Sequence, residues 1–209
     1  MFKRIIEDVN AVRDRDPAAR SFWEVFFLYP GVKAVRMHRR AHFYYKHNMM
    51  FLARLVSQRA ARKTGIEIHP GATIGRRLVI DHGTGVVIGE TTEIGDDVLI
   101  YQGVTLGGTG KDTGKRHPTI GNNVMISAGA KVLGPFKIGD NSRVAAGAVV
   151  LEEVPPNSTV VGVPARVVRQ DGKRVALDQI HIPDPVKQKM DSLEDRMAHL
   201  EAMLKEKTK

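Results

Sequence analysis

The chain of 209 residues contains no cysteine, and aromatic residues make up only 6% of it. The lack of cysteine excludes a thiol nucleophile, a Cys-x-x-Cys redox pair and thiolate metal sites, so any chemistry must use histidine, carboxylates, hydroxyls or backbone groups. Long hydrophobic runs are also missing, because the apolar stretch from Met49 to Ala53 ends at Arg54. We therefore expect no signal sequence, no association with a membrane and a cytoplasmic location.

Acidic residues are absent from one segment of the chain. The formal net charge is +9, and all of the excess lies in residues 31–66, which hold nine basic residues and no acidic one. The rest of the chain carries equal numbers of basic and acidic residues. A basic segment of this kind can bind nucleic acid or a partner protein, but its charges are scattered around the predicted helix. Ordinary solvation is the simpler interpretation, and no nucleic-acid partner is expected.

A shift in composition near Gly65 divides the chain. Ten of the twelve aromatic residues precede Leu52, whereas 18 of the twenty glycines lie between Gly65 and Gly162. This shift predicts an α+β protein with an N-terminal helical region, a repetitive β region and a C-terminal tail with a helix. The predicted boundaries are 1–64, 65–168 and 169–209.

The first region is predicted to contain three helices. Apolar residues at helical spacing begin at Phe2, and Asp16-Pro17 ends that helix. An apolar helix from Ser21 to Tyr29 follows, and Pro30-Gly31 breaks it. The third helix is basic and runs to about Lys63. Its expected packing face is formed by Val35, Met49, Leu52, Leu55 and Val56.

The second region repeats with a period of six residues. The recurring aliphatic residues, with a slip of two after Val86, are Ile68, Ile74, Ile80, Val86, Ile88, Ile94, Ile100, Leu106, Ile120, Ile126, Val132, Ile138, Val144 and Val150. This period suits a three-sided parallel solenoid with about eighteen residues in each coil and about five coils up to Arg166. Between Leu106 and Ile120 the spacing is too long for the repeat, so a polar, glycine-rich loop is predicted to leave the solenoid there.

Several linked motifs lie between about Asp16 and Val168. They are Ile-Glu-Ile-His-Pro-Gly-Ala (66–72), Asp-His-Gly-Thr-Gly (81–85), Gly-Gly-Thr-Gly-Lys (107–111), Arg-His-Pro (116–118) and Gly-Val-Pro-Ala-Arg (162–166). Together they closely resemble the active-site sequences of the serine O-acetyltransferases, a family of hexapeptide-repeat acyltransferases. The resemblance implies a left-handed parallel β-helix, an exception to the right-handed crossover rule. It also implies acetyl transfer from acetyl-CoA to the hydroxyl of L-serine, which gives O-acetyl-L-serine for cysteine biosynthesis.

The resemblance assigns roles to individual residues. His82 corresponds to the catalytic base, which a serine hydroxyl needs because it is a weak nucleophile. Glu67, where the family usually has aspartate, corresponds to the carboxylate that orients this base. It lies fifteen residues before His82, and an eighteen-residue coil places both on one side of the solenoid. Asp16 and Asp81 correspond to the partners of the substrate ammonium group.

The predicted loop and the glycine-rich backbone are expected to bind the rest of the substrates. Arg116 and His117 correspond to the pair that binds the substrate carboxylate, a task that suits a planar guanidinium group. Acetyl-CoA is expected as a co-substrate, with no permanently bound cofactor. Its candidate contacts are Gly108, Thr109, Ala128, Arg143, Ala146 and Arg166. Because there is no cysteine and no motif serine poised by a base, we expect a direct attack of serine on acetyl-CoA instead of a covalent acetyl-enzyme.

Two other functions stay open on the same fold. A zinc hydratase similar to the gamma-type carbonic anhydrases would bind its metal through His69, His82 and His117 from adjacent chains. An acetyltransferase with a homoserine or sugar acceptor would keep the mechanism and change only the acceptor. The set of residues matched to an amino acid argues against the hydratase and the sugar.

The resemblance also implies an assembly. A homotrimer is expected, because the family's coenzyme groove lies between adjacent chains, with a dimer of trimers as the alternative. L-cysteine is expected to inhibit by occupying the serine site. The family's complex with cysteine synthase uses a C-terminal isoleucine, and it is not expected here because the chain ends in Lys209. Heptad spacing near the C-terminus predicts a helix, with apolar residues at Val186, Met190, Leu193, Met197, Leu200 and Leu204. This helix either packs on the rest of the chain or joins subunits as a coiled coil.

Overall fold

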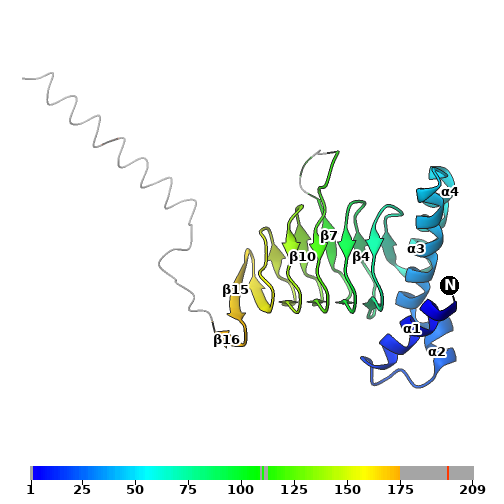
Figure 1. Ribbon diagram of the computed structural model, residues 1–209, viewed down its shortest axis with the longest axis horizontal. Helices are drawn as coiled ribbons and strands as arrows, with labels where there is room; N and C mark the ends of the chain where they lie inside the picture. The colour runs from blue at the N-terminus through cyan, green and yellow to red at the C-terminus, as the bar shows by residue number, and fades with distance from the viewer. Residues whose placement is uncertain (1, 109, 111–112, 175–196, 198–209) are drawn as a thin grey trace, which may run out of the picture. The chain divides into compact units, whose positions relative to one another are not determined.

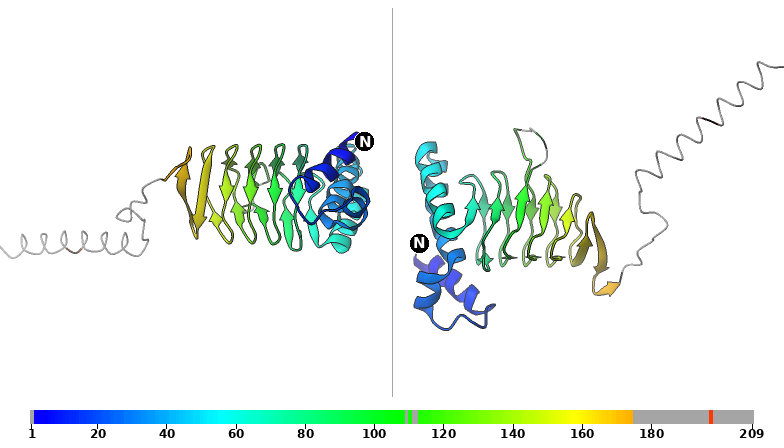
Figure 2. Two further views of the ribbon diagram at one scale, coloured as in Figure 1. Left: turned by 90° about the horizontal axis from the view of Figure 1, so that it is seen from below. Right: turned by 180° about the vertical axis from the view of Figure 1, so that it is seen from behind.

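The computed structural model describes residues 2–108, 110, 113–174 and 197. Helices come first: α1 (Phe2–Arg13), α2 (Phe22–Leu28), α3 (Pro30–Lys46) and α4 (Met50–Thr64). Short strands follow from Ile66 and wind into a parallel solenoid whose N-terminal end is covered by the helices (Figure 1). Figure 2 shows the same arrangement from two further directions.

The described strands form three sheets, one for each side of the solenoid. Sheet A contains β1 (Ile66–Ile68), β4 (Val86–Ile88), β7 (Thr105–Gly107), β10 (Lys131–Leu133) and β13 (Val149–Val150). Sheet B contains β2 (Thr73–Ile74), β5 (Glu93–Ile94), β8 (Thr119–Ile120) and β11 (Lys137–Ile138). Sheet C contains β3 (Val79–Ile80), β6 (Leu99–Ile100), β9 (Met125–Ile126), β12 (Arg143–Val144), β14 (Ser158–Gly162), β15 (Ala165–Gln170) and β16 (Lys173–Arg174). The last two strands pair antiparallel.

The register of the sheets confirms the predicted repeat. Ile68 pairs with Ile88, Ile88 with Leu106, and Leu106 with Val132, so each aliphatic residue stacks on its counterpart one coil away. The hexapeptide residues are buried inside the solenoid, apart from Ile74, which is half-buried near the helical end. Burial of each such side chain contributes about 1.5–3 kcal/mol. The predicted parallel β-helix of hexapeptide repeats is therefore confirmed.

The predicted third helix is in fact two helices. α3 ends at Lys46, and α4 begins at Met50 after a turn in which Asn48 has a φ of 56°. The buried face of α4 is formed by Ala53, Ser57, Ala60 and Thr64, while Met49 and Leu52 are exposed. The predicted packing face was wrong in α4 because it assumed that the helical periodicity of α3 continues without interruption past Lys46.

The predicted C-terminal helix falls outside the described residues, apart from Met197, which is helical. Among the helices that the structure describes, none is long and apolar enough to cross a bilayer.

Candidate active site

His82 lies in an enlarged corner between sheets C and A. Residues 81–85 connect Ile80 to Val86, whereas the corresponding corner of the next coil has only residues 101–103. His82 and Gly83 both take left-handed conformations, with φ of 57° and 80°. Histidine tolerates this region better than most residues with a side chain. The longer corner leaves the imidazole 73% exposed, where it can meet a substrate.

Two carboxylates lie beside this corner. Nε2 of His82 is 3.9 Å from Oδ2 of Asp81. Asp16, in the loop after α1, contributes the second carboxylate and lines the same small cavity as Asp81. The structure thus brings together three of the predicted residues, which come from two distant parts of the chain.

Tyr29, between α2 and α3, fixes the Asp16 carboxylate. Its hydroxyl donates a hydrogen bond of 2.7 Å to Oδ2, and the backbone amide of Ala18 donates one of 2.8 Å to Oδ1. These two hydrogen bonds hold the pKa of Asp16 below its usual value. The same contact with Asp16 raises the pKa of Tyr29 to about 12. Both groups are therefore in fixed protonation states at neutral pH.

The position of Glu67 differs from the one predicted from an eighteen-residue coil. It lies in β1 and pairs in register with Val87, twenty residues later, because the enlarged corner lengthens the first coil. The assumption of an eighteen-residue coil was therefore wrong at this point. No hydrogen bond or ion pair between Glu67 and His82 occurs in the part of the chain that the structure describes.

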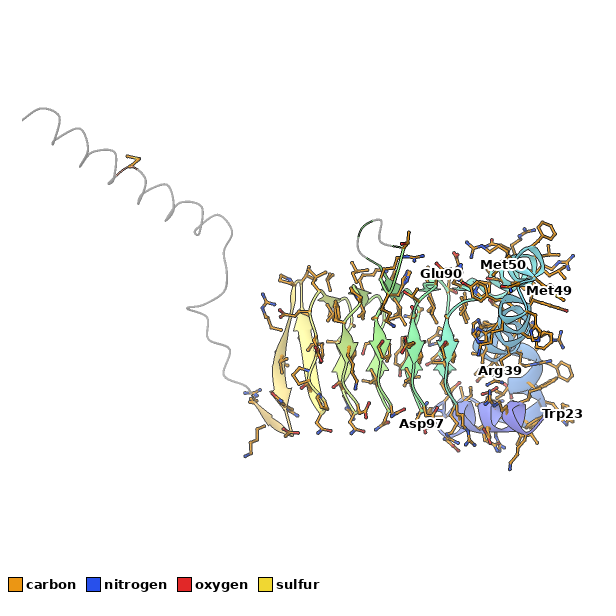
Figure 3. The ribbon with its side chains drawn as sticks, turned by 45° about the horizontal axis from the view of Figure 1, so that its top comes forward. Trp23, Arg39, Met49, Met50, Glu90 and Asp97 are labelled. Atoms are coloured by element: carbon orange, nitrogen blue, oxygen red, sulfur yellow. The ribbon has the colours of Figure 1, made fainter. Side chains whose placement is uncertain are left out.

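Arg116 and His117 lie at a different corner, between sheets A and B. The guanidinium group of Arg116 forms an ion pair with Glu90, whose other oxygen accepts a hydrogen bond of 3.1 Å from the Tyr45 hydroxyl. Thr91 Oγ1 accepts hydrogen bonds of 3.1 Å from the backbone amides of both Arg116 and His117. These contacts anchor the end of the loop after β7, close to Glu90 in Figure 3.

The electrostatics of this second corner favour an ionised Glu90 and a neutral His117. The ion pair with Arg116 holds the pKa of Glu90 below its usual value. Burial, assisted by the charge of Arg116, lowers the pKa of His117. The backbone amide of Thr91 donates to Nδ1 of His117 at 3.2 Å, which leaves the proton of the neutral ring on Nε2. Arg116 and His117 can therefore offer N–H donors to a carboxylate.

Within one chain the two corners are separate. Among the described residues, no hydrogen bond or cavity connects the group around His82 with the group around Arg116. Asp16, Tyr29 and Asp81, beside His82, line a cavity of about 10 Å³. Glu90 instead lines a cleft of about 430 Å³ on the other edge. One chain therefore holds a base with carboxylates at one edge and a cation at another.

The candidate acetyl-CoA contacts are distributed along the solenoid. Ala128 and Ala146 occupy successive coils of the same corner column as His82, and the amide of Gly147 donates to the carbonyl of Ala128 at 2.9 Å. Arg143 is exposed in β12, and Arg166 in β15 forms an ion pair of 2.7 Å with Glu152. Gly108 follows β7, and Thr109 falls outside the described residues.

A zinc site would need several ligands close together. In residues 2–108, 110, 113–174 and 197, no group of three His, Asp or Glu side chains of one chain could hold a metal ion.

The structure adds Tyr29, Tyr45 and Glu90 to the predicted residues. Glu90 follows β4 in the sequence Ile-Gly-Glu-Thr, at a corner of the solenoid. A polar residue at a predicted corner is therefore the sequence feature that could have identified it. Tyr29 gave no such signal, because its position before Pro30 indicates only a helix break.

The chain is similar to known proteins in sequence and in fold. The family model described as bacterial transferase hexapeptide (six repeats) matches residues 117–152. The serine acetyltransferase of Bacillus subtilis (strain 168) is 56% identical over 208 residues, which cover 99% of this chain and 96% of the relative.

Two solved structures are similar in fold as well. Soybean serine acetyltransferase complexed with serine is 47% identical with a TM-score of 0.77, covering 79% of this chain and 68% of that one. Serine acetyltransferase in complex with coenzyme A from Brucella abortus strain S19 is 45% identical with a TM-score of 0.79, covering 81% and 68%.

Proposed function

The chain belongs to the serine acetyltransferase family, and from this we propose that its two polar corners are the two halves of the active site. The resemblance inferred from the motifs is thereby confirmed. The protein is an acyltransferase that transfers the acetyl group of acetyl-CoA to L-serine, giving O-acetyl-L-serine and CoA for cysteine biosynthesis. We propose a cytoplasmic location, where acetyl-CoA and serine are both available.

The constellation of Asp16, Asp81 and His82 carries the proposal. His82 removes the proton of the serine hydroxyl while that oxygen attacks the thioester carbonyl of acetyl-CoA. The tetrahedral intermediate then collapses, the carbon–sulfur bond breaks, and the imidazolium returns its proton to the CoA sulfur. Asp16 and Asp81 bind the ammonium group of serine, and the orienting role of Glu67 stays a prediction.

The second corner supplies the remaining half of the acceptor site. Arg116, charged and held by Glu90, binds the serine carboxylate, and His117 donates from Nε2. Because the two corners lie on different edges of one solenoid, they combine only if the His82 corner of one chain faces the Arg116 corner of the next. We therefore propose a homotrimer as the catalytic unit, with a dimer of trimers as the alternative assembly.

Coenzyme binding follows from the same arrangement. Acetyl-CoA extends from the His82 corner past Ala128 and Ala146, whose small side chains leave room for it. Gly108, Thr109, Arg143 and Arg166 are proposed as further contacts. L-cysteine inhibits by occupying the serine site, and we expect no complex with nucleic acid or a membrane.

The decisive experiment measures CoA release from acetyl-CoA with L-serine, with L-homoserine and without an acceptor. Wild type should require serine, and His82→Ala should lower kcat by about 100-fold or more. His47→Ala, which changes an exposed histidine of the helical region, serves as the control and should behave like wild type. A preference for homoserine would overturn the acceptor, and full activity of His82→Ala would overturn the base.

A further inference from the structure

We propose that the Tyr29 hydroxyl is a third ligand of the acceptor's ammonium group and makes the enzyme specific for amino acids over hydroxy acids. This inference rests on the proposed function and adds a residue that the motifs do not include. Tyr29 reaches the site from the junction of α2 and α3, whereas His82 and Asp81 belong to the solenoid. The helical region therefore contributes to substrate recognition.

The direction of the hydrogen bond shows what Tyr29 can still bind. Its hydroxyl donates its only proton to Oδ2 of Asp16 at 2.7 Å, so the lone pairs of the phenol oxygen stay available as acceptors. Asp16 is fixed on its other side by the amide of Ala18. The hydroxyl thus adds a third oxygen of fixed orientation next to the two carboxylates.

The cavity bounded by these oxygens has the size of one small polar group. It measures about 10 Å³ and is lined by Asp16, Tyr29 and Asp81, by Arg15 and Tyr101, and by apolar residues such as Val12 and Leu99. A cavity of about 10–15 Å³ can hold one water molecule. An ammonium group is similar in size and has three N–H donors, which can be accepted by the oxygens of Asp16, Asp81 and Tyr29.

The local charges favour a cation in this cavity. Among the described residues, neither Asp16 nor Asp81 forms an ion pair with a lysine or arginine. Arg15 also lines the cavity, but its guanidinium group donates to the carbonyl of Asp97 at 2.8 Å and pairs with the Asp97 carboxylate at 3.5 Å. His82 is the remaining basic group that faces the carboxylates, and it must be neutral to act as a base. The ammonium group of the acceptor therefore supplies the missing positive charge.

The structural role of Tyr29 does not need its hydroxyl. The backbone amide of Tyr29 donates to Val25 at the end of α2, and its carbonyl accepts from Lys33 at the start of α3. Tyr29→Phe keeps these backbone contacts and the aromatic ring. The variant should fold normally, so its kinetics report on the hydroxyl alone.

The test compares Tyr29→Phe with wild type and with Tyr44→Phe, whose ring lies in α3 outside the cavity. We expect the KM for L-serine to rise by about 10- to 100-fold in Tyr29→Phe, with kcat and the KM for acetyl-CoA close to those of wild type. The preference for L-serine over L-glycerate, which has a hydroxyl in place of the ammonium group, should fall by a similar factor. Tyr44→Phe should leave all of these values unchanged.

Two results would overturn the inference. One is an unchanged KM for serine in Tyr29→Phe; the other is a parallel loss of kcat and of acetyl-CoA affinity, which indicates a structural role. In a double-mutant cycle with Asp16→Asn, additive effects on the KM for serine would also contradict it, because the two groups are expected to act as one unit. If the wild-type protein does not acetylate serine, the proposed function itself is wrong. The wild-type measurement therefore distinguishes a failure of the proposed function from a failure of the inference about Tyr29.

Discussion

The guanidinium group of Arg116 forms an ion pair with the carboxylate of Glu90, and this pair joins the end of the long loop to the corner after β4. Tyr45 from α3 donates to the same carboxylate at 3.1 Å. Three separate segments, α3, the corner and the loop, therefore meet at Glu90. The cation that we assign to the serine carboxylate is held in place by a residue that touches no substrate.

Replacing Glu90 by glutamine should weaken serine binding. Glu90→Gln keeps the shape of the side chain but removes the charge that orients Arg116. For a half-buried pair we expect a loss of about 1 kcal/mol, which corresponds to an approximately fivefold rise in the KM for serine. The control is Glu93→Gln, because Glu93 pairs with Lys115 instead of Arg116. Equal effects of the two substitutions in steady-state kinetics would contradict the positioning role of Glu90.

The fold was largely predictable because the hexapeptide repeat is a strictly local signal. Each aliphatic residue is buried at the same place in every coil, so the period in the sequence reports directly on the sheets. The enlarged corner around His82 could not be predicted in the same way, since the slip of two residues after Val86 does not show which corner absorbs it. The break at Asn48 was missed for a similar reason, because no proline marks it.

The site was predictable only in part. The motifs identified His82 and Arg116, but Tyr29 and Glu90 are brought to the site by contacts with Asp16 and Arg116, which lie 13 and 26 residues away in the sequence. Such contacts follow no period, and they depend on how the helices sit on the first coil. The family resemblance implied a coenzyme groove between adjacent chains, but the residue spacing did not show that the His82 and Arg116 corners lie on separate edges of one chain.

Gly83 should not tolerate a side chain. A Cβ atom there would lie 2.5 Å from Cδ1 of Ile66, which is fully buried, and the φ of 80° is unfavourable for alanine. We expect Gly83→Ala to lower the free energy of unfolding by about 2–4 kcal/mol and to reduce kcat by displacing His82. Gly172→Ala shares the positive φ but meets no atom within 4 Å, so it should cost only about 1 kcal/mol. Similar losses in denaturant titrations of the two variants would show that the contact with Ile66 is unimportant.

The stability of the protein should fall in mild acid because of His38. Burial, assisted by the neighbouring His42, lowers the pKa of His38 to about 3 from an ordinary value of 6.5. Between these pH values the unfolded chain binds a proton at His38 that the folded chain does not, so stability is lost as the pH falls. The contribution is about 1.4 kcal/mol for each pH unit below 6.5.

Denaturant titrations between about pH 6.5 and 4.5 measure this contribution. His38→Gln should give a shallower dependence of the unfolding free energy on pH than wild type, whatever its stability at pH 7. His47→Gln changes an exposed histidine and should keep the slope of wild type. An unchanged slope in His38→Gln would show that His38 does not bind a proton on unfolding.

The division of the active site between chains can be tested by mixing inactive subunits. His82→Ala and Arg116→Ala should each be inactive alone, since each removes one half of every site. In a trimer that contains both variants, the intact His82 corner of one chain faces the intact Arg116 corner of another at some of the interfaces. Random assortment of equal amounts should restore about one quarter of the wild-type sites.

The matched control mixes His82→Ala with Asp16→Ala. Asp16 and His82 lie at the same corner of one chain, so every site in such a trimer contains one of the two defects. Co-expressed and co-purified pairs should therefore recover serine-dependent CoA release only for the combination with Arg116→Ala. Recovery by neither pair would place the whole site within one chain, and recovery by both would separate Asp16 from His82. Because both mixtures contain the same His82→Ala subunit, a difference between them reports on the geometry of the site alone.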